Sequence, residues 1–240
     1  MNFSVILDNL DYLLIGAWPD GPLGGLALTL ILSVLSAIAS GVLGLIFGIA
    51  LAMSSGPVKT ALVIFLGFFR SIPIIMLIFW SYFLLPILMR VSVPEVGTVV
   101  VALSLVGGAY LAYTVAAGIE SVDAGQWNAG YALGFGRWQI LAIVVLPQAL
   151  RVMAPSFVNQ WASLVKDTSL AYVIGVPELS FVATQVNNRA MIYPTEIFLF
   201  IGVVYWCLCA AIDRFATWLT GRSGYSRNEA ASAKLKVSST

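Results

Sequence analysis

Residues 23–53 read LGGLALTLILSVLSAIASGVLGLIFGIALAM, a run that contains no charged side chain. An α-helix rises 1.5 Å per residue, so about 20 apolar residues cross a bilayer core roughly 30 Å thick. This run is therefore long enough to span a membrane as one helix.

Four further apolar runs follow, at 58–89, 96–119, 149–176 and 197–219. Pro73 interrupts the run 58–89, and a proline within a continuous apolar stretch predicts one kinked helix in preference to two short ones. We therefore expect an all-α integral membrane protein with five transmembrane helices.

The composition agrees with a membrane protein. Of the 240 residues, 60% are hydrophobic and 10% are charged, and the mean hydropathy is +0.96. Soluble domains average about 45–50% apolar and about 25% charged residues. Too few charges are present to cover a soluble globule, and the net charge of +1 offers no basic surface. A soluble enzyme, a disordered chain and a nucleic-acid-binding protein are excluded.

The side chains that most often carry catalysis are scarce. The chain has no histidine, which removes the commonest general base and metal ligand. Its two cysteines, Cys207 and Cys209, lie in an apolar run and are interpreted as apolar packing residues. We expect no metal site, no bound cofactor and no enzymatic activity on this chain.

Positive charge is distributed unequally between the two ends. Residues 1–22 contain three aspartates and no lysine or arginine, whereas the stretch after the fifth run is basic. The positive-inside rule places the N-terminus outside and the C-terminus in the cytoplasm, which requires an odd number of spans. We divide the chain into an external segment 1–22, a transmembrane domain 23–219 and a disordered cytoplasmic tail 220–240.

Small residues recur every fourth position in the first and third spans. The first carries Ser36, Ser40, Gly44, Gly48 and Ala52, and the third carries Ser104, Gly108, Ala112 and Ala116. Small side chains on one face allow membrane helices to approach closely. The pattern predicts either packing within the chain or an interface between subunits.

The loop 120–147 is expected on the cytoplasmic side and contains DAGQWNAGYALGFGRWQILAIVVLP at 123–147. Asp123 can cap a short helix over 126–133, which Gly134 ends. A second helix is expected over 137–145, with Pro147 directing the chain into the fourth span. Ala129 and Gly130 would form an exposed knob. The alternatives are a docking element and an interfacial hairpin without a partner.

This loop resembles the coupling signature of ABC-importer permeases. That signature has Glu-Ala-Ala, a glycine four residues later and then Leu-Pro; here Asn128-Ala129-Gly130, Gly134 and Leu146-Pro147 occupy those places. Asn128 lacks the acidic charge of the signature, and Gly130 replaces its second alanine. Further markers are typical of the polar amino-acid permeases: GQW at 125–127, LPQALR at 146–151, KDTSL at 166–170 and FRSIP at 69–73.

The resemblance implies a type I ABC-importer permease fold in the bacterial inner membrane. It implies cytoplasmic ATP-binding subunits, a second permease subunit and an extracytoplasmic solute-binding protein as partners. The chain has no Gly-x-x-x-x-Gly-Lys-Ser/Thr loop, so ATP and Mg²⁺ would bind to the separate ATPase subunit. The residues expected to couple to that subunit are Trp127, Asn128, Ala129, Gly130, Gly134 and Pro147.

Charged and hydroxyl side chains within the spans form the candidate translocation path. They are Arg70, Ser71, Lys166, Asp167, Thr168 and Ser169. A charge at mid-helix costs about 2.5–3.5 kcal/mol on insertion scales, so such residues face a cavity or pair with each other. Both an internal ion pair and a polar lining of the path are consistent with the pattern.

A polar amino acid is the expected substrate, with glutamate or aspartate favoured. The stretch 69–80 is most similar to glutamate/aspartate permeases, and Arg70 and Lys166 would attract an acidic substrate. The alternative is a stand-alone secondary transporter or channel. That alternative requires its own coupling-ion site and usually internal repeats, which the sequence does not display.

Overall fold

The computed structural model describes residues 4–90, 93–190 and 194–221. It is all-helical, and four helices are long and apolar enough to cross a membrane. These lie at α3 (Gly25–Met53), α7 (Glu95–Glu120), Arg137–Ile174 and α12 (Pro194–Gly221, of which Pro194–Trp218 is the candidate span). The predicted tail 220–240 lies almost wholly outside the described residues.

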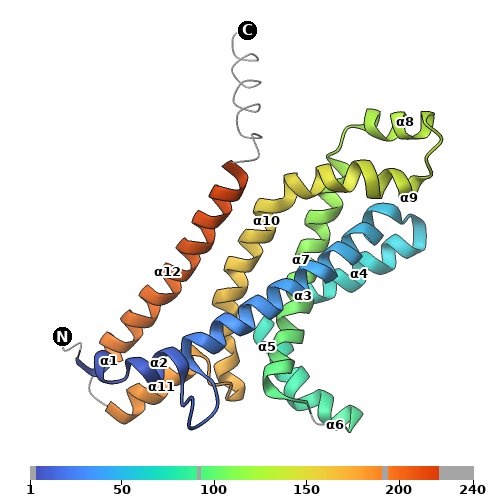
Figure 1. The fold of residues 1–240 in the computed structure, drawn as a ribbon. Helices are drawn as coiled ribbons and strands as arrows, with labels where there is room; N and C mark the ends of the chain where they lie inside the picture. The colour runs from blue at the N-terminus through green and yellow to red at the C-terminus, as the bar shows by residue number, and fades with distance from the viewer. Residues whose placement is uncertain (1–3, 91–92, 191–193, 222–240) are drawn as a thin grey trace, which may run out of the picture.

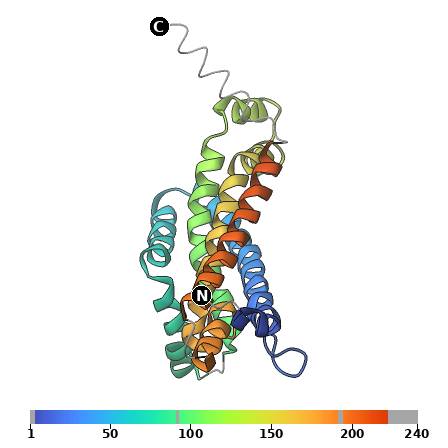
Figure 2. The same cartoon turned by 90° about the vertical axis from the view of Figure 1, so that its left-hand side faces the viewer.

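The spans form an elongated bundle with distinct ends (Figures 1 and 2). Helix α8 (Ala124–Ala132) and the last turns of α12 lie at one end, which we call the α8 end. Helices α1 (Ser4–Asp8), α2 (Leu10–Ile15) and α11 (Leu179–Ala190) lie at the other, the α11 end (Figure 1).

Helices α3 and α7 form the tightest pair through their small residues. Ser36, Ser40, Gly44 and Gly48 of α3 are buried, while Ile38 on the same helix is 62% exposed. A Cβ atom added to Gly48 would lie 2.4 Å from Cβ of Val115. The small-residue stripes therefore pack within the chain, and large apolar side chains face outward as a lipid environment requires.

The second apolar run is bent far more sharply than a kinked helix. Helix α4 (Gly56–Ser71) and the helical segment Ile74–Leu88, which begins with α5 (Ile74–Phe79), meet at 98°, so the predicted single kinked helix is wrong. Pro73 has no N–H to continue the α4 ladder and disfavours the helical conformation of Ile72, which is extended with ψ of 133°. The bent pair brings the number of candidate spans to five when it is counted as one span.

A π-helical turn and α6 complete this segment. After α5 the chain continues through η1 (Trp80–Leu84), a π-helical turn, and α6 (Leu85–Met89). Pro86 follows the π turn closely, and Leu85 N–H bonds the carbonyl of Trp80, five residues earlier. The wider turn thereby passes the proline without ending the helix.

The fourth span begins earlier than predicted. Helix α9 (Arg137–Ile140), the π turn η2 (Leu141–Val145), α10 (Leu146–Asp167) and the 3₁₀ turn η3 (Thr168–Ile174) form one continuous helix. Pro147 therefore lies inside this helix and not before its start. The π turn precedes Pro147 as η1 precedes Pro86, and Leu146 N–H bonds the carbonyl of Leu141.

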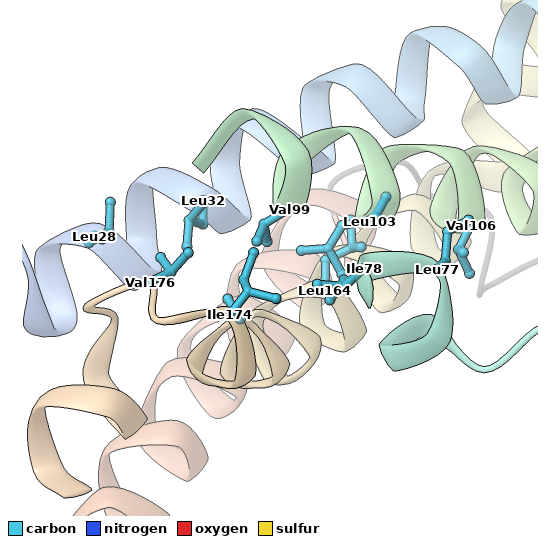
Figure 3. Close-up of a cluster of buried hydrophobic side chains, with 12 residues drawn as sticks. Leu28, Leu32, Leu77, Ile78, Val99, Leu103, Val106, Leu164, Ile174 and Val176 are labelled. Carbon is cyan, nitrogen blue, oxygen red and sulfur yellow. The ribbon is translucent and has the colours of Figure 1, made fainter. Parts of the chain in front are cut away.

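One cluster of buried apolar side chains joins the spans near the bend (Figure 3). It draws on α3, α5, α7, α10 and the chain after η3; its central members include Leu32, Ile78, Leu103, Leu164 and Val176. A second cluster at the α11 end packs Val5, Ile6 and Leu13 of the N-terminal helices against α11 and α12. Helix α11 lies between the apolar runs 149–176 and 197–219, where the sequence predicted no helix.

Candidate functional site

Helix α8 has a defined start and a defined end. Asp123 Oδ1 accepts a hydrogen bond of 2.6 Å from Gly125 N–H, as the predicted cap requires. At the other end Gly134 has φ of +84°, Gly134 N–H bonds the Tyr131 carbonyl, and Phe135 N–H bonds the Gly130 carbonyl. These two bonds form a Schellman motif, which confirms the predicted stop.

Gly130 is buried, so the predicted exposed knob is wrong at this residue. A Cβ atom added to Gly130 would lie 2.6 Å from Cγ1 of Ile140. Glycine thus allows α8 to lie directly on α9, and the bulk of Ile140 explains why the alanine of the coupling signature does not fit here. Asn128 and Ala129 remain exposed.

The predicted coupling residues lie together at the α8 end. Trp127 is half-buried and borders, with Tyr131 and Arg137, a hollow of about 400 Å³. Pro147 is exposed on the neighbouring helix, where Gln148 Nε2 donates to Gln126 Oε1 over 3.4 Å. A buried cluster around Ile140 and Val145 also contacts the ends of α3 and α7. The segment is thus attached to three spans.

A second concave site of about 340 Å³ lies between α5, α7 and α10. Its polar lining consists of Tyr110, Gln160, Ser163, Lys166 and Asp167. A cationic and an anionic side chain therefore share one cavity, together with amide and hydroxyl groups. This combination suits a small zwitterion, because each charged end finds an opposite charge.

Arg70 lies at the bend beside this cavity. Its guanidinium carbon is 4.3 Å from the ring centroid of Tyr113 and 5.0 Å from that of Tyr110. Tyr110 also donates a hydrogen bond of 3.4 Å to the Arg70 carbonyl, which α4 leaves without a helical partner. Ser71 is exposed at the end of α4. Arg70 is thus linked to the cavity through Tyr110.

The other two predicted path residues turn their hydroxyls toward the backbone. Thr168 is fully buried and donates to the Val165 carbonyl over 2.7 Å. Ser169 is half-buried and donates to the Lys166 carbonyl over 2.6 Å. Both hydroxyls are therefore engaged within η3 and its preceding turn, and of the predicted set Lys166 and Asp167 line the cavity.

Three lining residues were missed at the sequence level: Tyr110, Gln160 and Ser163. Gln160, Ser163 and Asp167 are spaced i, i+3 and i+7, so they occupy one helix face. That polar face within an apolar run was the available signal. Tyr110 had none, because only the fold brings α7 against this face.

Comparison with known proteins places the chain in a family. Residues 40–224 match the family described as binding-protein-dependent transport system inner membrane component. The chain is 34% identical over 213 residues to the inner membrane amino-acid ABC transporter permease protein YhdY of Escherichia coli (strain K12), which covers 85% of this chain and 57% of YhdY. It thus spans less than two thirds of that relative.

Two further relatives align over most of both chains. The glutamate/aspartate import permease protein GltK of Escherichia coli O157:H7 is 30% identical over 233 residues, covering 92% of this chain and 98% of GltK. The glutamine transport system permease protein GlnP of Escherichia coli (strain K12) is 34% identical over 194 residues, covering 78% and 87%.

Solved structures share the fold. A chain from "Crystal structure of an amino acid ABC transporter with histidines" superposes with a TM-score of 0.79 at 23% identity, covering 92% of this chain and 99% of that one. A chain of the MetNI methionine ABC transporter gives a TM-score of 0.66 at 20% identity, covering 80% and 93%. This chain therefore belongs to the binding-protein-dependent inner membrane components, in the branch of polar amino-acid ABC permeases, and is the multi-pass permease subunit and not the ATPase.

Proposed function

We propose that this chain and a second permease subunit, identical or paralogous, form the translocation path for a polar amino acid, with glutamate or aspartate favoured. The observation that carries the proposal is the cavity between α5, α7 and α10, where Lys166 and Asp167 both line the wall. Asp167 would receive the α-ammonium group of the substrate, and Lys166 a carboxylate. Arg70, 5.0 Å from the Tyr110 ring, adds positive charge near the same wall.

The arrangement at the bend supports a hydrated path. Carbonyl groups at the end of α4 and amide groups at the start of α5 lack helical partners. Irregular backbone within a membrane is tolerated where it is covered by protein or lines a water-filled cavity. Ile74, the first residue of α5, lines the cavity, so the bend and the cavity adjoin.

The partners follow from the two ends of the bundle. Cytoplasmic ATP-binding subunits, which carry ATP and Mg²⁺, would dock on α8 with its exposed Asn128 and Ala129 and the hollow beside Trp127. The solute-binding protein would deliver the substrate at the opposite, external end, where α11 lies (Figure 1). The N-terminus would then be external and the C-terminus cytoplasmic. Family membership favours this assembly over a stand-alone transporter.

Charge-removing variants test the cavity. In vesicles that contain the whole complex, Lys166→Met is expected to lower glutamate uptake at least tenfold and to affect a neutral amino acid less. Asp167→Asn is expected to lower uptake of both, because every amino acid carries the α-ammonium group. Lys59→Met, which removes an exposed lysine at the start of α4, is the matched control and should transport normally.

Membrane abundance must be measured alongside uptake. If Lys166→Met lost membrane abundance, Lys166 would be a member of an ion pair that stabilises the fold, since leaving its partner charge buried and unpaired costs about 3–5 kcal/mol. Normal glutamate uptake by this variant would contradict the substrate role.

A further inference from the structure

A cavity of about 360 Å³ lies at the α11 end, apart from the coupling segment and from the cavity between α5, α7 and α10. Its wall is built from α2, the loop 16–22 that follows it, the first residue of α7, the connection 175–177 and α11. Segments far apart in the sequence thus enclose one space. We call it the Glu95 cavity, after the one charged side chain among the described residues that line it.

The α11 wall of this cavity is held in place by a buried carboxylate. Glu178, fully buried just before α11, accepts hydrogen bonds from Ser180 N–H at Oε2 and from Phe181 N–H at Oε1, each over 3.0 Å. A helix start leaves such amide groups without partners, so the carboxylate caps α11. Tyr205 of α12 donates its hydroxyl to Oε2 over 3.0 Å as well, which joins the start of α11 to α12.

The other walls are also fixed by hydrogen bonds. Gly25 N–H at the start of α3 donates to the carbonyl of Pro177, a lining residue, over 2.8 Å. Two lining side chains are joined directly, because the Tyr12 hydroxyl of α2 donates to Oε1 of Gln185 on α11. The cavity is therefore formed before any ligand enters it, and a ligand does not have to order its walls.

The Glu95 carboxylate is only partly hydrogen-bonded within the described residues. Tyr82 of η1 donates its hydroxyl to Oε1 over 3.1 Å, which orients the carboxylate. In the described part of the chain, no donor bonds Oε2 and no lysine or arginine forms a salt bridge with Glu95. A cationic group in the cavity would be attracted by this carboxylate, and an anionic group would be repelled.

The remaining lining suits the stem of a long cationic side chain. Phe181, Val182 and Pro22 offer apolar surface, and Tyr12 and Gln185 add polar groups. Lysine and arginine pack their methylene stems on apolar surface while the charged group stays at a polar site. A divalent metal ion fits less well, because it takes several oxygen ligands and this lining supplies one carboxylate.

The N-terminal segment that contributes to the wall is acidic. Asp8, Asp11 and Asp20 are exposed on it, and residues 1–22 contain no lysine or arginine. Complementary charge speeds association and selects the orientation of a partner, so this surface favours a partner with a basic face. Free glutamate or aspartate would meet the repulsion of Glu95, which argues against a second site for an acidic substrate.

We propose that the Glu95 cavity receives a lysine or arginine side chain of the extracytoplasmic solute-binding protein and thereby anchors that protein on the permease. This role rests on the proposed function, in which the α11 end faces the solute-binding protein. Glu95 pairs with the cationic group, and the apolar wall covers its stem. Docking covers both charges, and a covered pair contributes more to affinity than a pair that stays in water.

The affinity of the cognate solute-binding protein for the complete complex in lipid nanodiscs tests the anchor. Glu95→Gln removes the charge but keeps an oxygen for Tyr82. It is expected to lower the affinity about tenfold at ~0.1 M salt and less at ~1 M salt, where charge is screened. Asp8→Asn removes an exposed charge at the same end without lining the cavity, so this matched control should change the affinity by less than about twofold. Equal affinities of Glu95→Gln and wild type would overturn the proposal.

Replacements on the binding protein identify the occupant of the cavity. Each exposed lysine and arginine of that protein is replaced by methionine, one at a time, and tested against the wild-type and the Glu95→Gln complexes. One replacement should cost about tenfold in affinity with wild type and nothing further with Glu95→Gln, because both changes remove the same pair. If Glu95→Gln does not assemble, the wild-type complex decides, and the absence of any replacement that lowers its affinity refutes the anchor.

Uptake measurements separate this result from the proposed function. If Glu95→Gln binds the solute-binding protein normally while glutamate uptake still requires Lys166, the anchor is overturned and the proposed function stands. If Glu95→Gln lowers uptake at unchanged affinity, the cavity takes the ammonium group of the free amino acid, and the anchor is again overturned. A wild-type complex that does not bind the solute-binding protein would contradict both.

Discussion

Gly134 is the residue on which the turn after α8 depends. Its φ of +84° is a conformation that Asn and Asp tolerate better than other side chains, and no atom lies within 4 Å of an added Cβ. Gly134→Asn and Gly134→Asp therefore differ mainly in charge. We expect Asn to retain substrate-stimulated ATP hydrolysis and Asp to abolish it, because a carboxylate would remain unpaired at the docking surface.

Membrane abundance serves as the control in this pair and should be similar for both variants. If Gly134→Asn and Gly134→Asp lost ATP hydrolysis equally, the cause would be the backbone conformation at this position and not the charge. Full activity of Gly134→Asp would argue against docking at this turn.

Individual residues of the two sites were predictable to different degrees. Asp123 and Gly134 were identified correctly because capping depends on local chemistry. Gly130 was misjudged because its burial depends on Ile140, a contact across a turn that sequence spacing does not reveal. Tyr110 and Glu178 escaped notice for the same reason, since their partners lie on helices distant in the chain.

At the scale of elements, the close approach of α3 and α7 is the feature most sensitive to side-chain size. A Cβ added to Gly48 would lie 2.7 Å from the Ala112 carbonyl oxygen, an atom that cannot move aside. Gly48→Ala should therefore destabilise the complex by about 1–3 kcal/mol. Thermal unfolding of the detergent-purified complex would measure the loss as a lower midpoint.

Gly202→Ala is the matched control for this variant. Gly202 is also helical, on α12, and nothing lies within 4 Å of an added Cβ. Its midpoint should stay unchanged or rise slightly, because alanine favours helix. If the two variants had equal midpoints, close packing at Gly48 would not limit stability.

The long helices were predictable because apolar length is a property of sequence alone. The run 23–53 corresponds to α3, and 96–119 corresponds to α7, within two residues at either end. The 98° bend at Pro73 was not predictable, because proline indicates a break but not its angle. Helix α11 was missed since its apolar face is short and its cap is a buried glutamate rather than a typical capping residue.

For the whole molecule, the orientation in the membrane is the property that most needs a test. The α8 end and the α11 end lie on opposite sides of the bundle (Figure 2). A reporter active only outside the cell should work when fused before Leu23 and fail when fused after Arg222, because basic residues are concentrated at the C-terminal end. A reporter active only inside should give the mirror-image result. The reverse pattern would place α8 on the wrong side for an ATPase.

The contact between α3 and α7 also has a mechanical consequence. Gly44 and Gly48 of α3 lie directly against Leu111 and Val115 of α7, so the two helices are too close for one to slide past the other. We therefore expect α3 and α7 to move as a rigid body during the transport cycle. Bending would concentrate where the helical hydrogen-bond ladder is already interrupted. These places are the Pro73 bend and the π turns before Pro86 and Pro147, which would act as the hinges of the permease.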